Sequence, residues 1–431
     1  MSFPRYPAYK DTGVRWLGQV PAHWNLKPLW SCFSRTKRTG FEDEVLLSVY
    51  RDYGVIPKAS RDDNFNKPSD DLSAYQLVNE GDLVVNKMKA WQGSVAISDH
   101  RGIVSPAYFV YESLHGEVPR FFHYLMRCDR YITGYLSISE GVRVNQWDMD
   151  PALHSRMPLL IPSMNEQEAI ADFLDHETAK IDALVAEQEQ LIILLKEKRQ
   201  AVISHAVTKG LAPKVPMKDS GVEWLGEVPA HWSVSALSYL SSIETGSTPD
   251  RGDPSYWNGT IPWLKTGEIN WEPIREAEEF ITEAGLANSA AKLSQPGTLL
   301  MAMYGQGVTR GRVALLEIEA TYNQACAAIT FGDRVMPEFG RYFFMAAYDH
   351  IREGGNETSQ MNLSAGLIAK FRLTVPPKSE QAAIVKKLDD ELSGVEVLCD
   401  EAETVVRLLQ ERRSALISAA VTGQIDVRNL A

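Results

Sequence analysis

The sequence predicts an α+β fold in which two similar modules are each followed by a long helix. We expect the two helices to pair as an antiparallel coiled coil about a pseudo-two-fold axis. Three observations lead to this prediction. An opening segment occurs twice, a long amphipathic block occurs twice, and a mixture of short strand-like and helix-like segments lies between them. The 431 residues are enough for more than one packed core.

The opening segment is the clearest repeat. Residues 11–24, DTGVRWLGQVPAHW, return as residues 219–232, DSGVEWLGEVPAHW, with 11 of 14 positions identical. A histidine beside a tryptophan closes both copies. We interpret these side chains as packing anchors rather than as ligands or base-stacking platforms. The residues concerned are His23, His231, Trp16, Trp24, Trp224 and Trp232.

The second repeat is a helical block with a sustained heptad pattern. Asn165 and Ser379 are the expected N-caps, and Gly210 and Gly423 lie just past the expected ends. About 42 helical residues correspond to a rod of roughly 60 Å. The apolar seam positions are Ile170, Leu174, Ile181, Leu184, Leu191, Leu195 and Val202 in the first block, and Ile384, Leu388, Val395, Leu398, Val405, Leu409 and Leu416 in the second.

The repeat also predicts how the helices pair. Two halves related by a pseudo-two-fold axis place the helices antiparallel and return the C-terminus toward the first module. A seam centred between residues 187 and 188 pairs Glu177 with Arg412 and Lys198 with Glu391. These charges occupy seam positions, where an unpaired charge is costly.

These repeats divide the chain into four parts. We expect a first module at residues 1–160, a helix at 161–210, a second module at 211–374 and a second helix at 375–431. Each module should hold a small irregular sheet. The expected strands are 82–86, 94–97, 297–303 and 325–331, and the expected helices are 120–126 and 339–347.

Net charge and cysteine content bear on which partners, metal sites and cellular compartment we expect for the protein. The net charge is −12, of which residues 166–200 and 380–413 carry −9, so the rest of the chain is close to neutral. Composition therefore neither supports nor excludes a nucleic-acid partner. The four cysteines stand singly, which argues against a zinc site or a disulfide framework and favours a reducing compartment. Without a signal peptide or a long apolar run, we expect a soluble cytoplasmic protein.

Signatures of catalysis are missing from the sequence. It has no phosphate-binding loop, no dinucleotide fingerprint, no adenine-methylase motif and no histidines at metal-ligand spacing. We therefore expect no catalytic residues, no metal site and no cofactor in this chain. An enzyme with an unrecognised motif remains an alternative.

Four polar segments, together with a few loop residues, invite a nucleic-acid-binding interpretation. Arg, Lys, Gln, Asn and Thr on glycine-rich backbone suit contacts with phosphates and base edges. Solvated turns without a ligand are the alternative for each segment. The candidates in the first module are Lys87, Lys89, Trp91, Gln92, Arg143, Asn145 and Gln146. Those in the second module are Arg251, Lys265, Thr266, Tyr304, Gln306, Thr309, Arg310, Arg312, Asn356, Gln360 and Asn362.

Together these motifs resemble the DNA-specificity subunit of a type I restriction–modification system. The resemblance rests on the doubled GVxWLGxVPAHW and on Ile161-Pro162…Glu166-Gln167…Ile170 with its copy. It also rests on residues 256–263, YWNGTIPW, and residues 322–324, YNQ, in the second module. The first module departs from the pattern, because it has no equivalent of YWNGTIPW.

The resemblance implies two target-recognition domains that each read one half of a bipartite, asymmetric site in double-stranded DNA. The helices would act as a spacer and as the dock for two methyltransferase subunits, and restriction/translocase subunits would complete the complex. Adenine methylation from S-adenosylmethionine would belong to the methyltransferase partner. A protein scaffold built on the coiled coil, with no DNA role, is the competing hypothesis.

Overall fold

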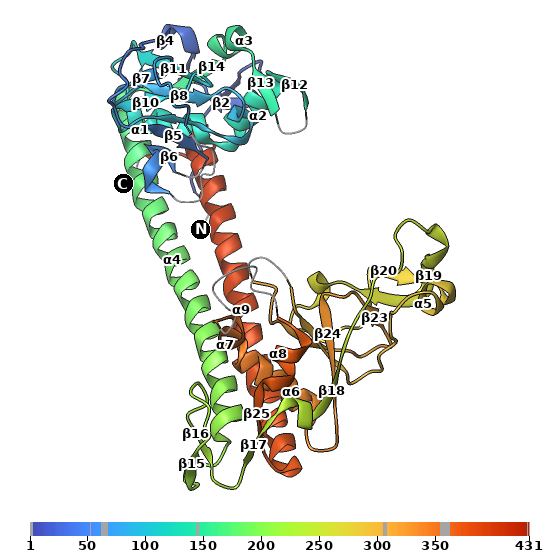
Figure 1. Cartoon of the computed structure of the whole chain (residues 1–431). Helices are drawn as coiled ribbons and strands as arrows, with labels where there is room; N and C mark the ends of the chain where they lie inside the picture. The colour runs from blue at the N-terminus through green and yellow to red at the C-terminus, as the bar shows by residue number, and fades with distance from the viewer. Residues whose placement is uncertain are drawn as a thin grey trace. The chain divides into compact units, whose positions relative to one another are not determined.

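The computed structural model describes residues 3–51, 53–61, 68–143, 146–304, 308–353, 363–428 and 430. The chain forms two compact units. Unit 1 comprises Met1–Glu189 with Thr404–Ala431, and unit 2 comprises Gln190–Glu403. Two long helices, α4 (Met164–Lys209) and α9 (Lys378–Val421), contribute residues to both units (Figure 1).

The core of unit 1 is built on a four-stranded antiparallel sheet with the strand order β4-β11-β8-β9. Its strands are β4 (Phe33–Thr36), β11 (Tyr108–Ser113), β8 (Leu83–Asn86) and β9 (Val95–Ile97). The helices α1 (Pro119–Arg127) and α2 (Asp129–Ser137) bury aromatic side chains in the core shared with this sheet. Two pairs of strands flank the sheet, namely β1 (Tyr9–Asp11) with β2 (Gln19–Pro21) and β3 (Asn25–Pro28) with β14 (Pro158–Ile161).

Unit 2 repeats this arrangement with the strand order β18-β24-β21-β22. Its strands are β18 (Ser241–Thr245), β24 (Cys326–Phe331), β21 (Leu299–Ala302) and β22 (Val313–Leu315). The helix α6 (Pro337–Ala346) packs on the sheet, and α7 (Tyr348–Glu353) follows it. The flanking pairs are β15 (Met217–Asp219) with β16 (Glu227–Pro229) and β17 (Ser233–Ala236) with β25 (Arg372–Val375). The strands and helices expected within the modules are thus confirmed.

The units differ in what is inserted into the common scaffold. Unit 1 adds the pairs β5 (Leu47–Tyr50) with β6 (Gly54–Pro57), β7 (Gln76–Val78) with β10 (Gly102–Val104), and β12 (Ser139–Arg143) with β13 (Gln146–Met149). Unit 2 adds a sheet of β19 (Trp257–Leu264), β20 (Glu279–Ile281) and β23 (Thr321–Tyr322), with α5 (Glu283–Ala287) beside it (Figure 1). The scaffold is therefore repeated while the insertions are specific to each unit.

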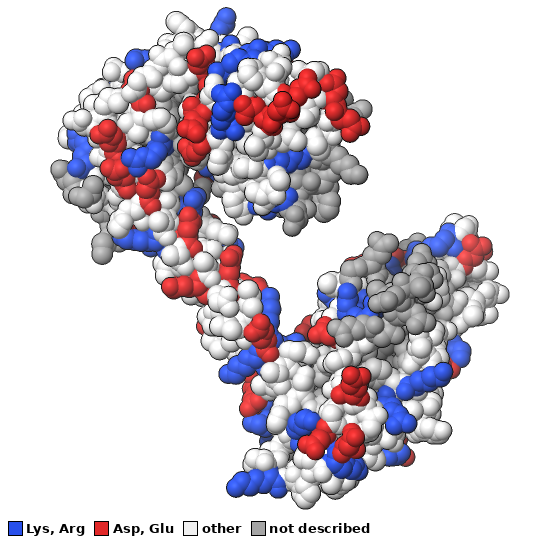
Figure 2. All heavy atoms as spheres, turned by 60° about the vertical axis from the view of Figure 1, so that its left-hand side comes forward, with Lys and Arg blue, Asp and Glu red and all other residues white. Residues whose placement is uncertain are grey.

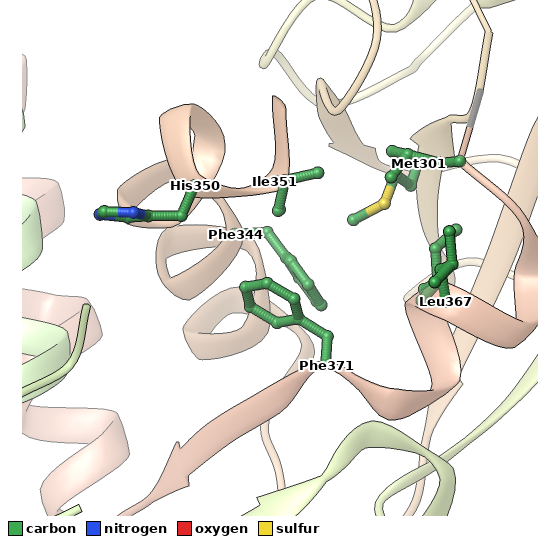
Figure 3. A pocket seen from close by; sticks show the side chains of 8 residues that line it. Met301, Phe344, His350, Ile351, Leu367 and Phe371 are labelled. Carbon is green, nitrogen blue, oxygen red and sulfur yellow. The ribbon is translucent and has the colours of Figure 1, made fainter. Parts of the chain in front are cut away.

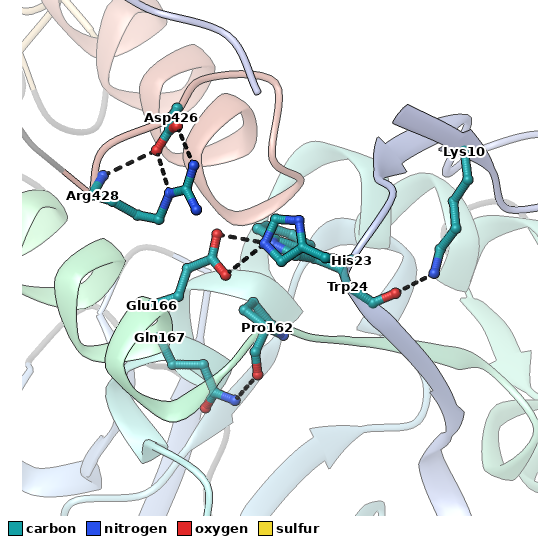
Figure 4. A network of polar contacts seen from close by, with 8 residues as sticks. All are labelled: Lys10, His23, Trp24, Pro162, Glu166, Gln167, Asp426 and Arg428. Carbon is teal, nitrogen blue, oxygen red and sulfur yellow. Dashed lines mark hydrogen bonds and ion pairs between the residues drawn. The ribbon is translucent and has the colours of Figure 1, made fainter. Parts of the chain in front are cut away.

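The repeated His-Trp pair anchors the start of each long helix. In unit 1, Trp24 Nε1 donates to the Glu166 carboxylate at 3.0 Å, and His23 Nε2 lies 3.0 Å from its other oxygen (Figure 4). In unit 2, Glu380 makes the same two contacts with Trp232 and His231, at 2.9 and 2.7 Å. The predicted packing role of this motif is confirmed.

The predicted N-cap residues of the two long helices are wrong. Because α4 begins at Met164 and α9 at Lys378, Asn165 and Ser379 lie inside the first turns and are not N-caps. The glutamine that follows each anchoring glutamate completes the anchor. Gln167 Nε2 donates to the Pro162 carbonyl at 3.0 Å, and Gln381 Nε2 donates to the Pro376 carbonyl at 2.8 Å.

The predicted partners between the helices do not form direct ion pairs, although the charge of Arg412 helps the hydrogen bond from Lys180 to lower the pKa of Glu177. Glu177 pairs instead with Lys180, and Glu391 with Lys387, each within its own helix. The contacts between helices are Asp182–Arg413 in unit 1, and Arg199–Glu396 and Lys196–Glu403 in unit 2. In unit 2 the residue numbers rise along α4 as they fall along α9, so these segments run antiparallel, as expected.

The heptad pattern could not fix the register, because contacts outside the seam also set it. In unit 1, Ser414 Oγ donates to Asp129 of α2 at 2.7 Å. The seam itself is buried at its ends and only in part nearer its middle. Ile170, Leu174 and Ile181 are at most 4% exposed. Nearer the middle, Leu195 and Val395 are 8% exposed, whereas four positions are between 40% and 49% exposed, namely Leu184, Leu191, Leu398 and Val405.

Gly423 closes α9 against the opening motif of unit 1. Its φ is +69°, and a Cβ there would lie 2.3 Å from Pro21 Cδ. Gly210 closes α4 in the same way with φ +78°, but its Cβ would come no nearer than 3.0 Å to the Trp232 ring and 3.9 Å to Pro229 Cγ. The predicted helix ends are confirmed.

We expect Gly423→Ala to lower the free energy of unfolding by about 2–4 kcal/mol, because it combines a left-handed backbone with a clash against a rigid proline. Gly210→Ala should cost about 1–2 kcal/mol, mainly from the backbone conformation. Urea unfolding of the full chain followed by circular dichroism measures both. Equal losses would show that the contact with Pro21 is unimportant.

Candidate nucleic-acid interface

Two of the predicted segments of unit 1 meet beside the sheet. The first follows β8 and contains the short 3-10 helix η3 (Ala90–Gln92), and the second is the β12–β13 hairpin. The Met149 N–H donates to the Lys87 carbonyl at 3.0 Å. Lys87 Nζ lies 3.7 Å from the Asp148 carboxylate, and the Trp91 and Trp147 rings have centroids 4.7 Å apart. Backbone, ion-pair and ring contacts thus hold the loop and the hairpin together.

The loop is also braced internally. Trp91 Nε1 donates to the Met88 carbonyl at 3.1 Å, and the Gln92 N–H donates to the Lys89 carbonyl at 3.0 Å. Gly93 closes the turn with φ +90°. Beside the hairpin, Leu136, Ser139, Glu140, Gly141 and Trp147 line a shallow open depression. A two-stranded ribbon has the right width for the major groove of DNA, so this surface can present side chains to base edges.

The hairpin also carries the second predicted segment of unit 1. The backbones of Arg143 and Gln146 pair across its end. Asn145 lies outside the described residues.

In unit 2, the loops that follow β19 and β21 converge on the loop between β23 and β24. The Asn323 N–H donates to the Leu264 carbonyl at 2.9 Å, and the Met303 N–H donates to the Ala325 carbonyl at 2.8 Å. Lys265 and Tyr304 directly follow Leu264 and Met303, so both predicted positions lie beside this loop. Tyr304 is 38% exposed, and Thr266, which begins the 3-10 helix η6 (Thr266–Glu268), is half-buried.

Arg251 and Lys265 share a carboxylate. Arg251 Nη1 lies 2.6 Å from one oxygen of Glu279, and Lys265 Nζ lies 3.0 Å from the other. Lys265 also lies 3.0 Å from Glu278, and the Arg251 guanidinium stacks 3.8 Å from the Trp257 ring centroid. The hydrogen bond from Arg251 lowers the pKa of Glu279, and those to Glu279 and Glu278 raise the pKa of Lys265.

Neither glutamate is among the residues that the sequence predicts for the site. They stand in the acidic run at residues 276–279, which was a visible signal, but its position beside the cations depends on the pairing of β19 with β20.

The arginine-rich loop of unit 2 is less open than its composition indicated. Arg310 is 8% exposed, and its Nη2 donates to the Arg352 carbonyl on α7 at 2.8 Å. Arg312 and Thr309 are half-buried, and the Arg312 N–H donates to the Thr309 carbonyl at 3.1 Å. Val308 is the more open neighbour, at 59% exposed. The remaining predicted residues lie outside the described residues, namely Gln306, Asn356, Gln360 and Asn362.

Charges of both signs are intermingled on the visible surface. Figure 2 shows lysine and arginine beside aspartate and glutamate over unit 1 and along the exposed helical segment. Phosphate attraction by such a surface is weaker than by a continuous basic one. Binding of a nucleic acid by such a surface would therefore depend on positioned groups such as those above.

An apolar pocket near α7 does not resemble a nucleotide site. Its lining is Met301, Phe344, His350, Ile351, Leu363, Leu367, Ile368 and Phe371. Figure 3 shows the rings of Phe344 and Phe371 beside each other, and their centroids are 5.8 Å apart. A nucleotide pocket needs several convergent polar groups, and this lining supplies mainly hydrocarbon.

Within the described residues, no three or more His, Cys, Asp or Glu side chains are grouped to hold a metal ion. Cys32, Cys128 and Cys326 are buried, and burial raises the pKa of the Cys128 thiol to about 11 and that of the Cys326 thiol to about 12. Such thiols are poor nucleophiles at neutral pH. No helix in the described part of the chain is long and apolar enough to cross a membrane.

Known proteins resemble this chain over much of its length. Residues 229–396 match the family model for the type I restriction modification DNA specificity domain. The specificity subunit of the type I restriction enzyme EcoKI from Escherichia coli K12 is 22% identical over 445 residues, covering 95% of this chain and 91% of that protein. The chain is thus similar to type I restriction–modification specificity subunits along almost its whole length, and residues 229–396 match their DNA specificity domain. The sequence resemblance is thereby confirmed.

Further relatives extend the comparison. The MjaIX specificity subunit of Methanocaldococcus jannaschii is 27% identical over 176 residues, covering 38% of this chain and 40% of that protein. Among solved structures, one chain from a study of the assembly of a type I restriction–modification system aligns with a TM-score of 0.72 and 14% identity, covering 94% of this chain and 99% of that one. The HsdS subunit from Thermoanaerobacter tengcongensis aligns with a TM-score of 0.51 and 15% identity, covering 94% and 98%. The predicted fold class is confirmed by these neighbours.

Proposed function

We propose that this specificity subunit recognises a bipartite, asymmetric target in double-stranded DNA, with unit 1 reading one half and unit 2 the other. The observation that carries the proposal is the contrast between a repeated scaffold and unlike loops. The two units have the same strand order and the same Glu-His-Trp anchor. Their candidate reading surfaces are a hairpin in one unit and a charged cluster in the other.

Two linked readers suit this task. A chain with two weak DNA-binding modules gains affinity when both engage the same duplex. It also selects targets whose half-sites have the matching spacing. The continuous helices α4 and α9 enter both units and are the proposed spacer.

The residues proposed to contact DNA are those that the sequence predicts, and five of them, Asn145, Gln306, Asn356, Gln360 and Asn362, lie outside the described residues. In unit 1 they are Lys87, Lys89, Trp91, Gln92, Arg143, Asn145 and Gln146. In unit 2 they are Arg251, Lys265, Thr266, Tyr304, Gln306, Thr309, Arg310, Arg312, Asn356, Gln360 and Asn362. Among those of unit 2 that the structure describes, Tyr304, Arg251 and Lys265 are the more exposed, and Arg310 requires its loop to open.

The chain is proposed to act without catalytic residues of its own. Two methyltransferase subunits would dock on α4 and α9, bind S-adenosylmethionine and methylate adenine, and restriction/translocase subunits would join through them. Large apolar side chains exposed on these helices support a protein partner, since such groups are favoured at interface cores. Examples are Ile193 at 50% and Leu194 at 52% exposure on α4, and Leu408 at 50% on α9.

We expect the double variant Ile193→Asp/Leu194→Asp to reduce co-purification with the methyltransferase at least tenfold, because two carboxylates would be buried in the interface. Melting of the chain alone should change little, since both side chains are already half exposed. Leu153→Asp on α3 (Pro151–Ser155), 48% exposed and off the long helices, is the matched control. If the double variant still co-purifies with the methyltransferase, the face of α4 that carries Ile193 and Leu194 is not part of the docking surface.

Co-expression with the proposed methyltransferase partner tests the function itself. Modified bases are sequenced across host DNA with and without the chain. We expect a two-part motif with a fixed gap that is methylated only when the chain is present. Methylation independent of the chain, in a complex shown to assemble, would instead favour a scaffold without a DNA role.

A further inference from the structure

The Arg251–Lys265 cluster of unit 2 is neutral although it holds two cations. Glu279 contacts both of them, and Glu278 contacts Lys265 as well, at the distances given above. All four side chains reach solvent, with exposed fractions of 53% for Arg251, 36% for Lys265, 72% for Glu278 and 28% for Glu279. A phosphate that approaches this surface meets two carboxylates together with the two cations.

The cluster is held rigidly by its surroundings. Glu279 lies in β20, where its backbone is paired with that of Trp263 in β19. Glu268 accepts hydrogen bonds from the backbone N–H groups of Lys265 and Glu278, at 2.7 and 3.1 Å. The Arg251 guanidinium is stacked on Trp257. Groups fixed on strands and by secondary contacts keep their geometry better than groups on free loops.

Ion pairing of this kind affects sequence-independent binding to phosphates and sequence-specific binding to bases differently. Sequence-independent binding comes from the release of counterions when cations neutralise phosphates, and a cation already paired with a carboxylate contributes little to it. Base edges remain attractive, because a carboxylate accepts hydrogen bonds from cytosine N4 and Arg or Lys donates to guanine. A neutral, ordered cluster therefore lowers affinity for phosphate while it leaves base contacts available.

We propose that Glu279 is a specificity-determining residue of unit 2. By pairing with both Arg251 and Lys265, it suppresses sequence-independent binding of this unit to DNA, so that tight binding depends on base contacts that replace the ion pairs. This inference rests on the proposed DNA-reading function. In this role Glu279 controls the ratio of target to non-target affinity rather than the affinity for the target.

The test is Glu279→Gln in the complex of the full chain with its methyltransferase. Affinities for a duplex containing the mapped target and for a duplex lacking it are measured over a range of KCl concentrations. We expect non-target affinity to rise about threefold, and the slope of log K against log salt to steepen by about one, because one more phosphate contact forms. Target affinity should rise less, so the specificity ratio falls.

Glu317→Gln is the matched control. It removes the same charge from unit 2 and releases Arg275, whose Nε and Nη2 donate to Glu317 at 2.7 and 3.1 Å, outside the converging loops. The control should leave the salt slope and the specificity ratio unchanged.

Equal effects of the two variants would reduce the role of Glu279 to net charge and overturn the proposal. An unchanged non-target affinity for Glu279→Gln, or a loss of target affinity alone, would overturn it as well. A wild-type complex without any preference for its target would instead contradict the proposed function.

Discussion

Replacing Glu166 with alanine is expected to lower the free energy of unfolding by roughly 2–4 kcal/mol. The Glu166 side chain is 3% exposed, and Trp24, which donates to it, is fully buried. Its removal leaves the indole N–H of Trp24 without an acceptor in a place that water does not reach, which costs far more than the net value of the hydrogen bond. The start of α4 would lose its anchor to unit 1 at the same time.

The internal repeat supplies a matched control. Glu380→Ala removes the same pair of contacts in unit 2, but the Glu380 side chain is 41% exposed, so water can replace it. We expect Glu380→Ala to lower the free energy of unfolding by about 1 kcal/mol. Urea unfolding of the full-length variants gives both values. Similar losses at the two positions would contradict the argument from burial.

The second large effect is expected at Trp147, which joins the hairpin of unit 1 to its loop. Trp147→Ala removes the ring contact with Trp91 and should relax base preference in one half of the target by about tenfold, the value of roughly one mismatched base pair. The other half should stay unchanged. Methylation kinetics on duplexes with single base changes in each half measure this difference.

Two further variants separate positioning from stability. Trp147→Phe keeps an aromatic contact with Trp91 and should retain most of the discrimination. Trp30→Ala removes a tryptophan of the same unit that is 60% exposed and lies outside the loop and hairpin, and should leave specificity intact. Trp147→Ala protein that melts normally and still discriminates at both halves would exclude Trp147 as a positioning residue.

The sequence predicted the scaffold because its determinants are local and occur twice. The doubled opening motif, the seam positions near the helix ends and the apolar runs at residues 82–86 and 297–303 each identify an element without reference to distant contacts. Helix ends at Gly210 and Gly423 follow from the left-handed conformation that glycine tolerates.

Features that depend on tertiary packing were not predictable in the same way. A heptad pattern is equally satisfied by several registers, so the Asp182–Arg413 contact could not be distinguished from Glu177–Arg412. For the same reason the sequence did not indicate that Leu184 and Leu398, in the middle of the seam, are half exposed.

The candidate site was predicted in part. Composition identified Lys87 and Trp91 in one unit and Arg251 and Lys265 in the other as loop residues, and the structure places each pair in one surface. Composition could not show that Arg310 packs against α7, because burial of an arginine depends on a distant carbonyl acceptor. Nor could it reveal Glu279, whose place beside the cations follows from strand pairing.

In the proposed function, the two units read DNA independently from a common scaffold. The most direct measurement is genome-wide sequencing of methylated bases with the wild-type chain, with Trp147→Ala and with Lys265→Ala. We predict a two-part motif with an unchanged gap, degenerate in one half for Trp147→Ala and in the other half for Lys265→Ala. A continuous motif, or a change in both halves from either single substitution, would contradict the claim.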